Sequence, residues 1–554
     1  MPVITLYQER FNKFLGRRVS LDQMARWLPW IGVDLEEMGP NFVKIEFNPN
    51  RIDMCSYAGI ARAFKGLKGW EIGIPKYELR SCRMMLRIDG SLSTIRPYML
   101  AAVVRNIRLD EDTIAELMEI QEDLHWGIGR NRKKASIGIH NLDAVNPPFE
   151  FKAVSPERVR FVPLDRSEEM TLQEILDKHE KGIAYRHLVD WAPKYPLLVD
   201  SDDKVLSMPP IINGELTRVV GNTRNLFLDV TGTDYKAVAR SLNVLVTALA
   251  DMGATIEKVR VEYLDHTEDS PNLAPQRMQF NVVLANESLG LNLSEAEAIK
   301  CLKKCRLDAR KAEKMVLDVT IPAYRIDILH EIDLVEEIAI GHGYYRMKPT
   351  LPLTITVGQE HEAGKLANIT RQIMIGLGFT EVMNFMLSNK ETHYVKMQKK
   401  NRKVARLANP TSTEYTILRQ ELLPGLMQNF MDNRSESFPQ RLCEVSDVIV
   451  VNMEAESRCE RRLHVAGAFS YANANFTEVK SIAEALLANL GLHRWRVTAA
   501  KHPSYIEGRA AIISLGKRKI GIVGEIHPKV LSNFELENPV AAFEIDLENL
   551  IKKG

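Results

Sequence analysis

The sequence lacks an excess of either charge, since 73 basic and 72 acidic residues leave a formal net charge of +1 over 554 residues. The net charge of the whole chain is therefore too small to attract nucleic acid. Any contact with nucleic acid has to be made by a local basic patch. Cysteine is scarce, with six residues, of which only Cys301 and Cys305 lie within one helical turn. No second pair completes a zinc site, so we interpret all six as free thiols in a reducing cytoplasm.

Long apolar runs, fixed-period repeats and low-complexity segments are also missing. No apolar run can span a bilayer, and the start MPVITLYQER lacks the hydrophobic region of a signal peptide. We therefore expect a cytoplasmic protein with no membrane partner. Hydrophobic residues at 45% and charged residues at 26% are ordinary for a globular protein, and a length of 554 residues predicts several domains.

The most informative segment is acidic and spans residues 322–345, PAYRIDILHEIDLVEEIAIGHGYY. Its apolar spacing predicts a short helix over 333–340, with Asp333, Glu336 and Glu337 on the opposite face. Three like charges this close repel one another unless a cation lies among them. A hard divalent ion with oxygen ligands is one candidate, with Asp327 as the fourth ligand. The alternative is a solvated acidic face at the start of a helix.

Two other charged segments leave their role open. In segment 48–54, residues 48–51 predict a turn, and Arg51 and Asp53 favour a local ion pair that fixes this turn over a site. The basic run 130–134, RNRKK, is either a solvated face or a contact with an RNA backbone. His140 follows soon after, and a lone histidine is more often structural than catalytic.

Residues 205–219 and 225–234 predict a small-molecule pocket. Pro209-Pro210 stiffens the first segment, and its polar residues 213, 215 and 217 alternate as on one side of a strand. The second predicts a buried strand, Leu226–Val230, with polar residues where it ends. Polar groups beside a rigid turn are typical of a small-molecule pocket. The alternative is an ordinary turn without a pocket.

Other segments give local predictions of secondary structure. Capping boxes are expected at Ser20, Thr171 and Ser294. The polar residues 265–271 predict a linker. The remaining predicted elements are helices over 238–252, 364–376 and 476–492, and strands over 380–387, 441–451 and 541–546.

The acidic segment resembles the B5 domain of phenylalanine–tRNA ligase β subunits, whose pattern is Pro-x-x-Arg-x-Asp, Asp-Leu-x-Glu-Glu and Gly-Tyr. The resemblance implies that Asp327, Asp333, Glu336 and Glu337 bind Mg²⁺. Segments 205–219 and 225–234 resemble the B3/B4 domain of the archaeal and eukaryotic subunits, which hydrolyses tyrosine wrongly attached to the phenylalanine tRNA. The implied editing pocket holds Leu206, Ser207, Pro210, Asn213, Asp229 and Thr231. No Ser–His–Asp or Cys–His constellation is evident there, so we expect a positioned water rather than a covalent intermediate.

The C-terminal part resembles the catalytic-like domain of the same subunits. Leu418-Arg419-Gln420-Glu421 is similar to the class II synthetase Arg-x-Glu signature, whose arginine grips ATP. The third class II motif, with a second arginine, is missing, which leaves the triphosphate too few partners. The resemblance therefore implies a pseudo-catalytic partner of an active α subunit, with no residue of this chain catalysing aminoacylation.

The resemblance implies a multidomain α+β fold with four domains. They are an N-terminal α/β module (1–80), a B3/B4-like editing domain (81–268), a winged-helix-like B5 domain (269–346) and a class II synthetase-like antiparallel sheet domain (347–554). The implied assembly is an α2β2 tetramer that joins phenylalanine to tRNA(Phe) using ATP and Mg²⁺. The last strand lies close to residue 554, without the extra modules of bacterial β subunits, which favours the archaeal/eukaryotic type. A stand-alone editing hydrolase and a non-enzymatic nucleic-acid-binding scaffold remain alternatives.

Overall fold

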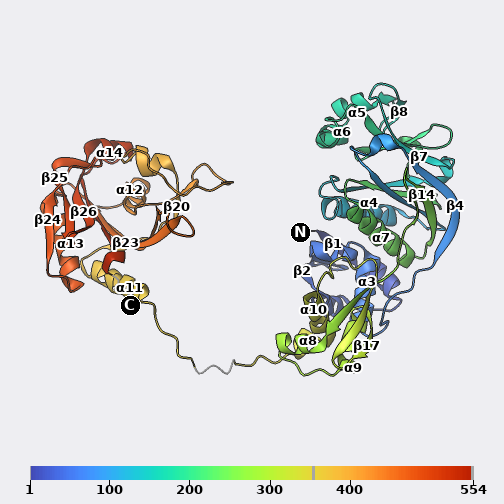
Figure 1. The fold of residues 1–554 in the computed structure, drawn as a ribbon, viewed down its shortest axis with the longest axis horizontal. Helices are drawn as coiled ribbons and strands as arrows, with labels where there is room; N and C mark the ends of the chain where they lie inside the picture. The colour runs from blue at the N-terminus through green and yellow to red at the C-terminus, as the bar shows by residue number, and fades with distance from the viewer. Residues whose placement is uncertain (1, 352–355, 551–554) are drawn as a thin grey trace. The chain divides into compact units, whose positions relative to one another are not determined.

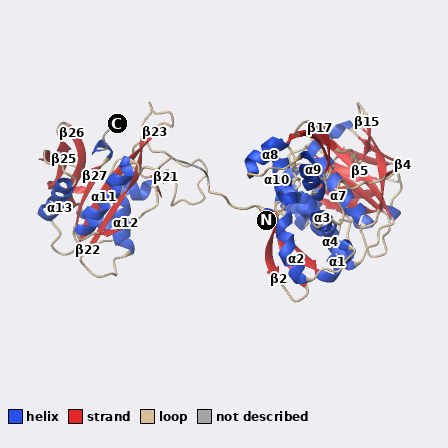
Figure 2. Ribbon diagram, turned by 90° about the horizontal axis from the view of Figure 1, so that it is seen from below, coloured by secondary structure: helices blue, strands red, loops and turns tan. Residues whose placement is uncertain are grey.

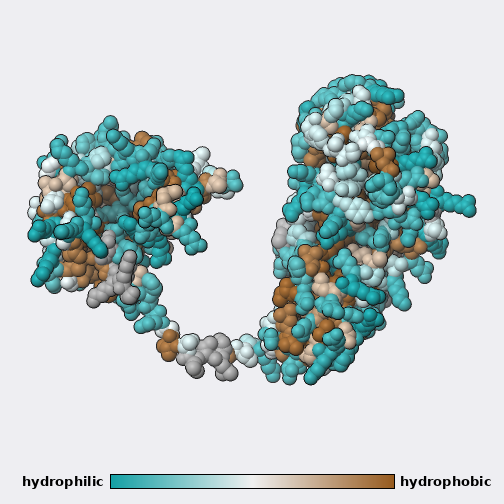
Figure 3. Space-filling view, in the orientation of Figure 1, coloured by the Kyte–Doolittle hydropathy of each residue, from teal (hydrophilic) through white to brown (hydrophobic). Residues whose placement is uncertain are grey.

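The computed structural model describes residues 2–351 and 356–550. The chain forms two compact units, Met1–Leu351 and Pro352–Gly554, which are described separately below (Figure 1). Hydrophilic side chains cover most of the visible face of each unit (Figure 3). Within the described residues, no helix combines the length and the apolar character needed to cross a membrane. Five of the six cysteines are free thiols, as predicted, and the side chain of the sixth, Cys82, lies outside the described residues.

The N-terminal module consists of a three-stranded antiparallel sheet and three helices. The strand order is β1-β3-β2. The predicted capping box is present, since Ser20 accepts from the backbone of Gln23 and Gln23 returns the contact. The elements are β1 (Val3–Tyr7), α1 (Gln8–Leu15), α2 (Leu21–Trp27), β2 (Val33–Met38), β3 (Phe42–Phe47) and α3 (Tyr57–Leu67).

A large mixed sheet forms the middle of the first unit and shares its hydrophobic core with the N-terminal module. Its strand order is β12-β11-β10-β7-β4-β14-β5-β13-β6, with β15 paired to β14. The helices α4 (Glu111–Trp126) and α7 (Tyr235–Asp251) both pack against β6 and lie side by side in both ribbon views (Figures 1 and 2). The strands are β4 (Leu79–Ile88), β5 (Tyr98–Arg105), β6 (Ala135–Asn141), β7 (Phe149–Val154), β10 (Tyr195–Val199), β11 (Val205–Met208), β12 (Ile212–Asn213), β13 (Leu226–Gly232), β14 (Thr255–Glu262) and β15 (Thr267–Ser270).

The linker predicted at residues 265–271 is wrong, because most of this segment belongs to the sheet. Its residues 267–270 form β15, antiparallel to β14. The buried Ser270 hydroxyl donates to the carbonyl of Ala101 at 2.7 Å and accepts from its N–H at 3.0 Å. The polar composition reflects a short strand with mostly exposed side chains, since β15 pairs with β14 alone.

Beyond the large sheet, the first unit contains two smaller layers. The capping box predicted at Thr171 begins α5 (Leu172–Lys178), which α6 (Glu180–Tyr185) follows. Residues 276–342 form a three-stranded antiparallel sheet, β16-β18-β17, covered by three helices. The capping box at Ser294 is present, and the predicted helix over 333–340 lies inside α10. These elements are β16 (Gln276–Asn281), α8 (Val282–Leu289), α9 (Glu295–Lys304), β17 (Asp308–Glu313), β18 (Val316–Ile321) and α10 (Glu331–His342).

The second unit contains a seven-stranded sheet, mostly antiparallel (Figure 2). A hydrophobic core lies on each face of this sheet. The predicted helices and the strands over 441–451 and 541–546 are present. The strand predicted over 380–387 is wrong, because only its two ends pair, with different partners. The elements are α11 (Glu362–Gly376), β19 (Thr380–Glu381), β20 (Leu387–Ser388), β21 (Ile417–Leu418), α12 (Leu423–Asp432), β22 (Gln440–Val451), β23 (Cys459–Ser470), α13 (Phe476–Asn489), β24 (Trp495–Ala499), β25 (Tyr505–Leu515), β26 (Arg518–Ile526), α14 (Pro528–Asn533) and β27 (Val540–Asp546).

Candidate functional site

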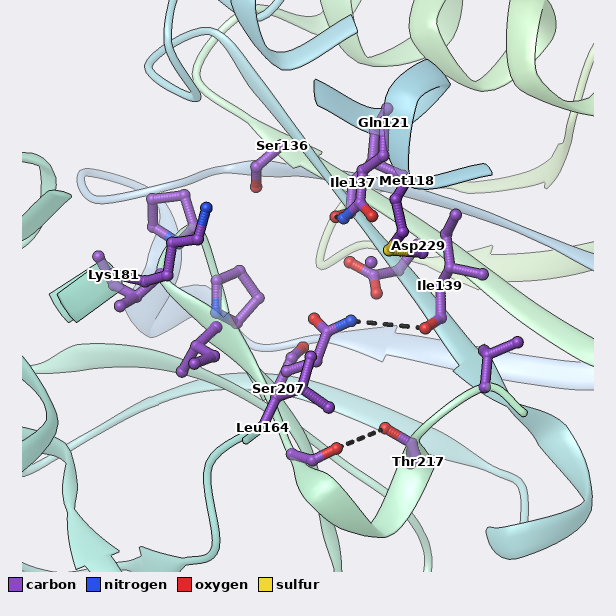
Figure 4. A pocket seen from close by; sticks show the side chains of 18 of the residues that line it. Met118, Gln121, Ser136, Ile137, Ile139, Leu164, Lys181, Ser207, Thr217 and Asp229 are labelled. Carbon is purple, nitrogen blue, oxygen red and sulfur yellow. Dashed lines mark hydrogen bonds between the residues drawn. The ribbon is translucent and has the colours of Figure 1, made fainter. Parts of the chain in front are cut away.

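A cavity of about 470 Å³ opens beside the large sheet, lined by residues of α4, β6, β13 and the 205–219 segment (Figure 4). Most of its wall is apolar, and the polar groups come from separate parts of the chain. Four of the six predicted pocket residues line it, namely Ser207, Pro210, Asn213 and Asp229. Asp229 is 1% exposed, so its carboxylate belongs to the wall of the cavity rather than to the protein surface.

The other two predicted residues lie behind this wall. Leu206 is fully buried in the hydrophobic core. Thr231 is fully buried too, and its hydroxyl accepts a hydrogen bond of 2.8 Å from Arg96 Nε. Both therefore support the cavity without lining it.

A histidine bridges Asp229 to a hydroxyl. His140 Nε2 lies 2.8 Å from Asp229 Oδ2, and its Nδ1 lies 2.8 Å from Thr217 Oγ1. When Nε2 carries the proton and donates it to Asp229, Nδ1 accepts from the Thr217 hydroxyl. The hydroxyl belongs to a threonine, so this contact is not one of the Ser–His–Asp or Cys–His constellations considered above. The sequence does not reveal it, because 89 residues separate His140 from Asp229. The alternation predicted through residue 217 is wrong, since β12 ends at Asn213 and residues 215–217 form a 3₁₀ turn.

The pairing of β6 with β13 brings these residues together. Gly138 lies opposite Asp229 in the register. A Cβ atom at Gly138 would lie 2.0 Å from Asp229 Oδ2 and 2.6 Å from His140 Nε2. Glycine is therefore needed at this position if the carboxylate and the imidazole are to meet.

A buried cation lies behind Asp229. The guanidinium of Arg96 is 3% exposed and donates only to oxygens of neutral groups, including Ser136 Oγ at 2.9 Å and the carbonyl of Thr231 at 2.8 Å. Burial lowers the pKa of Arg96 to about 9, against the attraction of Asp229. Because a buried cation without a bonded carboxylate is costly, we assign Arg96 to electrostatic support of the Asp229 carboxylate.

The rigid diproline turn is held in place by Arg132. Its Nη1 donates to the carbonyl of Ile211 at 3.0 Å and to that of Pro210 at 3.3 Å, and its Nη2 pairs with Glu122 at 2.8 Å. The hydroxyl of Ser207, next to this turn, is buried and has no hydrogen-bond partner in the described structure. A buried hydroxyl left unpaired costs free energy, so this group is available to a ligand in the cavity.

The acidic segment forms a second cluster, and arginines balance its charge. Arg325 pairs with Asp327 at 2.7 Å and with Glu337 at 2.5 Å. Arg51, which pairs with Asp53 at 2.9 Å as predicted, lies 4.0 Å from both Asp327 and Glu337. Burial raises the pKa of Asp327, but the attraction of Arg325 outweighs it and holds that pKa below its ordinary value.

The other two acids are not directed at the same point. Asp333 accepts from the backbone N–H groups of Leu329 at 2.7 Å and His330 at 2.8 Å, which fixes the start of α10. Burial and the neighbouring Glu337 raise the pKa of Glu336. In the described part of the chain, no three His, Cys, Asp or Glu residues are placed to hold a metal ion. The arginines pair with Asp327 and Glu337 in this arrangement, so the Mg²⁺ site implied by the resemblance stays a prediction and no chemistry is assigned to the ion here.

Arg419, from the segment similar to the class II signature, is held inside the second unit. It is 3% exposed, and its Nη1 donates to Glu444 at 2.7 Å while its Nε donates to the carbonyl of Asp447 at 3.0 Å. Glu444 also accepts from the side chain of Asn384 at 2.8 Å. The guanidinium is thus used to join strands and loops of the sheet.

Comparisons with known proteins cover both units. The family models that match are a phenylalanyl-tRNA synthetase beta chain CLM domain at residues 347–547 and a tRNA synthetase B5 domain at residues 278–344. The phenylalanine–tRNA ligase beta subunit of Archaeoglobus fulgidus is 42% identical over 100% of both chains. That of Methanothrix thermoacetophila is 40% identical over 99% of this chain and 100% of its own length. The chain belongs to the family of archaeal-type phenylalanine–tRNA ligase β subunits.

A solved structure of this β-subunit family agrees with the first unit. It is an N-terminal fragment of the phenylalanyl-tRNA synthetase beta subunit from Pyrococcus horikoshii, with 36% identity and a TM-score of 0.60. The match covers 62% of this chain and 99% of the fragment. The resemblance given by the sequence and the multidomain α+β fold class are therefore confirmed. The sequence does not reveal the roles of His140, Thr217, Arg96 and Arg132 around the cavity, because their contacts join segments that are far apart in the sequence.

Proposed function

We propose that this chain supports the ATP-dependent attachment of phenylalanine to tRNA(Phe) by an α subunit, in a cytoplasmic α2β2 assembly that uses Mg²⁺. Full-length similarity to named β subunits carries this proposal. The buried Arg419–Glu444 pair supports a non-catalytic role for the second unit, since an arginine already paired at 2.7 Å is poorly placed to grip a phosphate. Phenylalanine-dependent ATP–pyrophosphate exchange, measured with and without the α subunit, tests it. Exchange by the pure β chain would refute the proposal that the synthetic site lies on the α subunit.

We further propose that the cavity hydrolyses Tyr-tRNA made in error. Tyrosine differs from phenylalanine by one hydroxyl, and an apolar synthetic pocket rejects an added hydroxyl only about a hundredfold. A second site can instead recognise that hydroxyl with a buried polar group. Phenylalanine would leave this polar group unpaired, so the second site rejects phenylalanine. The observation that supports this role is the buried Asp229, held by His140 at 2.8 Å in a mostly apolar wall.

In this proposal, Asp229 accepts a hydrogen bond from the phenolic hydroxyl, and the unpaired Ser207 hydroxyl gives a second polar contact. His140 and Gly138 hold the carboxylate in place without touching the substrate. A water molecule adds its hydroxyl to the ester carbonyl carbon, the bond from that carbon to the ribose oxygen breaks, and the water proton passes to the ribose oxygen. The products are tyrosine and uncharged tRNA, with no covalent enzyme intermediate.

Substitutions of Asp229 in the assembly with the α subunit test the editing proposal. We expect Asp229→Ala to leave phenylalanine charging within about twofold of wild type while Tyr-tRNA accumulates, because the hydroxyl acceptor is lost and the synthetic site lies on the α subunit. Asp229→Asn keeps the shape and separates charge from packing. Unchanged deacylation of preformed Tyr-tRNA by both variants would remove Asp229 from the site. Loss of phenylalanine charging as well would assign it to folding instead.

A further inference from the structure

A basic groove lies at the C-terminal end of α4, the helix that also lines the cavity. It has a volume of about 680 Å³, and its lining includes Trp126, Arg130, Lys134, Asp234, Lys236 and Arg240. Four of these six residues are cations and one is an anion. Lys134 pairs with Asp234 at 3.0 Å. Arg130, Lys236 and Arg240 make no ion pair with any carboxylate of the described chain, so the groove carries a positive charge that the protein does not balance.

The placement of two of these cations is unfavourable for the protein alone. Lys236 and Arg240 are four residues apart on α7, so they share one face and repel each other. Lys236 also lies in the first turn of α7, where the helix dipole disfavours a positive charge. Asp234, which caps the start of α7, offsets the dipole in part, and an anionic ligand in the groove would relieve the remaining repulsion.

The loop that carries Arg130 belongs to the groove and the cavity together. Arg130, Asn131 and Arg132 are consecutive non-glycine residues with φ of 50°, 53° and 67°. Such left-handed conformations each cost about 1–2 kcal/mol and persist where the surroundings enforce them. Arg132 supplies this constraint, since it donates to the diproline turn of the cavity. The loop therefore points Arg132 into the cavity wall and leaves Arg130 and Lys134 in the groove.

Helix α4 makes a second connection. Gln121 and Glu122 of this helix line the cavity, and Trp126, near its end, lines the groove. Four to five residues of helix correspond to about 6–8 Å along its axis. Trp126 is 49% exposed, which makes its indole available to a flat partner.

We propose that the basic groove binds the single-stranded 3′ end of the tRNA whose ester enters the cavity. This inference rests on the proposed editing function for its biological setting, but not for the binding itself. The ester is attached to the last nucleotide, so a chain of phosphates has to leave the cavity along the adjoining surface. Unpaired cations match phosphates, and an exposed indole can stack on a base without regard to sequence.

The test measures binding of uncharged RNA to the full chain by fluorescence anisotropy across a range of salt concentrations. The probe is an acceptor-stem minihelix with its single-stranded 3′ tail, and the comparison is the same minihelix without the tail. We expect Lys236→Gln with Arg240→Gln to weaken binding of the tailed probe at least tenfold. The slope of log affinity against log salt should fall by about 1.4, for two lost phosphate contacts on a single strand. Glutamine keeps the helix propensity of both positions.

Trp126→Ala separates stacking from charge. It should weaken binding of the tailed probe about tenfold at an unchanged salt slope, because stacking involves no counterion release. The matched control is Lys517→Gln with Arg518→Gln, which removes two exposed cations from the second unit and should leave the affinity within twofold. The proposal is overturned if the control has the same effect as the groove variants, or if the probe without the tail binds as well and responds equally. Deacylation of Tyr-tRNA is recorded separately, so a chain that binds the tail but hydrolyses nothing refutes only the editing function.

Discussion

Replacing Gly138 by alanine tests the geometry of the cavity without removing any functional group. The added methyl carbon would lie 2.0 Å from Asp229 Oδ2, whereas ordinary van der Waals contact begins near 3.4 Å. The carboxylate then has to move by more than about 1 Å, a displacement that can cost about 100-fold in rate. We therefore expect hydrolysis of preformed Tyr-tRNA to slow about 100-fold. Stability should fall by about 1.5–3 kcal/mol, because the buried contact between Asp229 and His140 is broken.

The assay is single-turnover deacylation at saturating enzyme, with the folded fraction of each variant checked by thermal melting. Gly232→Ala is the matched control, since it lies on the same strand as Asp229 and its methyl would meet the carbonyl of Lys134 at 2.0 Å. This control should lose a similar amount of stability but less than tenfold in rate. A Gly138→Ala variant that is folded and hydrolyses Tyr-tRNA within threefold of wild type would refute the role given to the Asp229–His140 contact.

Two further predictions concern charges outside the cavity. Arg325→Met should lower the stability of the first unit by about 3–5 kcal/mol in urea unfolding, because Asp327 and Glu337 lose a buried partner. Recovery of that loss on adding Mg²⁺, but not K⁺, would show that the freed carboxylates accept a metal ion. Burial, with Glu119 and Glu122 nearby, raises the pKa of Asp123 to about 7. An acid with a raised folded-state pKa reduces stability as pH rises from its unfolded pKa to the folded one. The melting temperature of Asp123→Asn, relative to that of wild type, should therefore rise as the pH increases from about 4 to about 7. An equal difference in melting temperature at the two pH values would contradict this reasoning.

Features set by neighbouring residues were predictable from the sequence. The capping boxes at Ser20, Thr171 and Ser294 are present because their hydrogen bonds span only three residues. The buried strand beginning at Leu226 is also found, since an apolar run between turn signals is a local pattern. Family resemblance added the order of the domains, which no periodicity contains.

Features set by strand pairing were not predictable. The contact between His140 and Asp229 depends on the register of β6 against β13, and a shift of β6 by one residue would turn His140 to the opposite face of the sheet from Asp229. The composition of residues 267–270 predicts a linker, because a partly exposed strand that pairs on one side has the polar composition of a loop. In both cases the deciding interaction lies far away in the sequence.

The charged segments 48–54 and 322–345 are two halves of one buried interface. Considered alone, the first predicts a local ion pair and the second an acidic cluster that needs a cation. In the structure, Arg51 lies 4.0 Å from Asp327 and Glu337, and Arg62 of the N-terminal module lies over the ring of Tyr324 at 3.7 Å. Burying several charges is tolerated only when each is paired, so arginines from both segments are needed before either segment can be buried. Arg325 and Arg51 thus place positive charge of the protein itself beside the acidic segment.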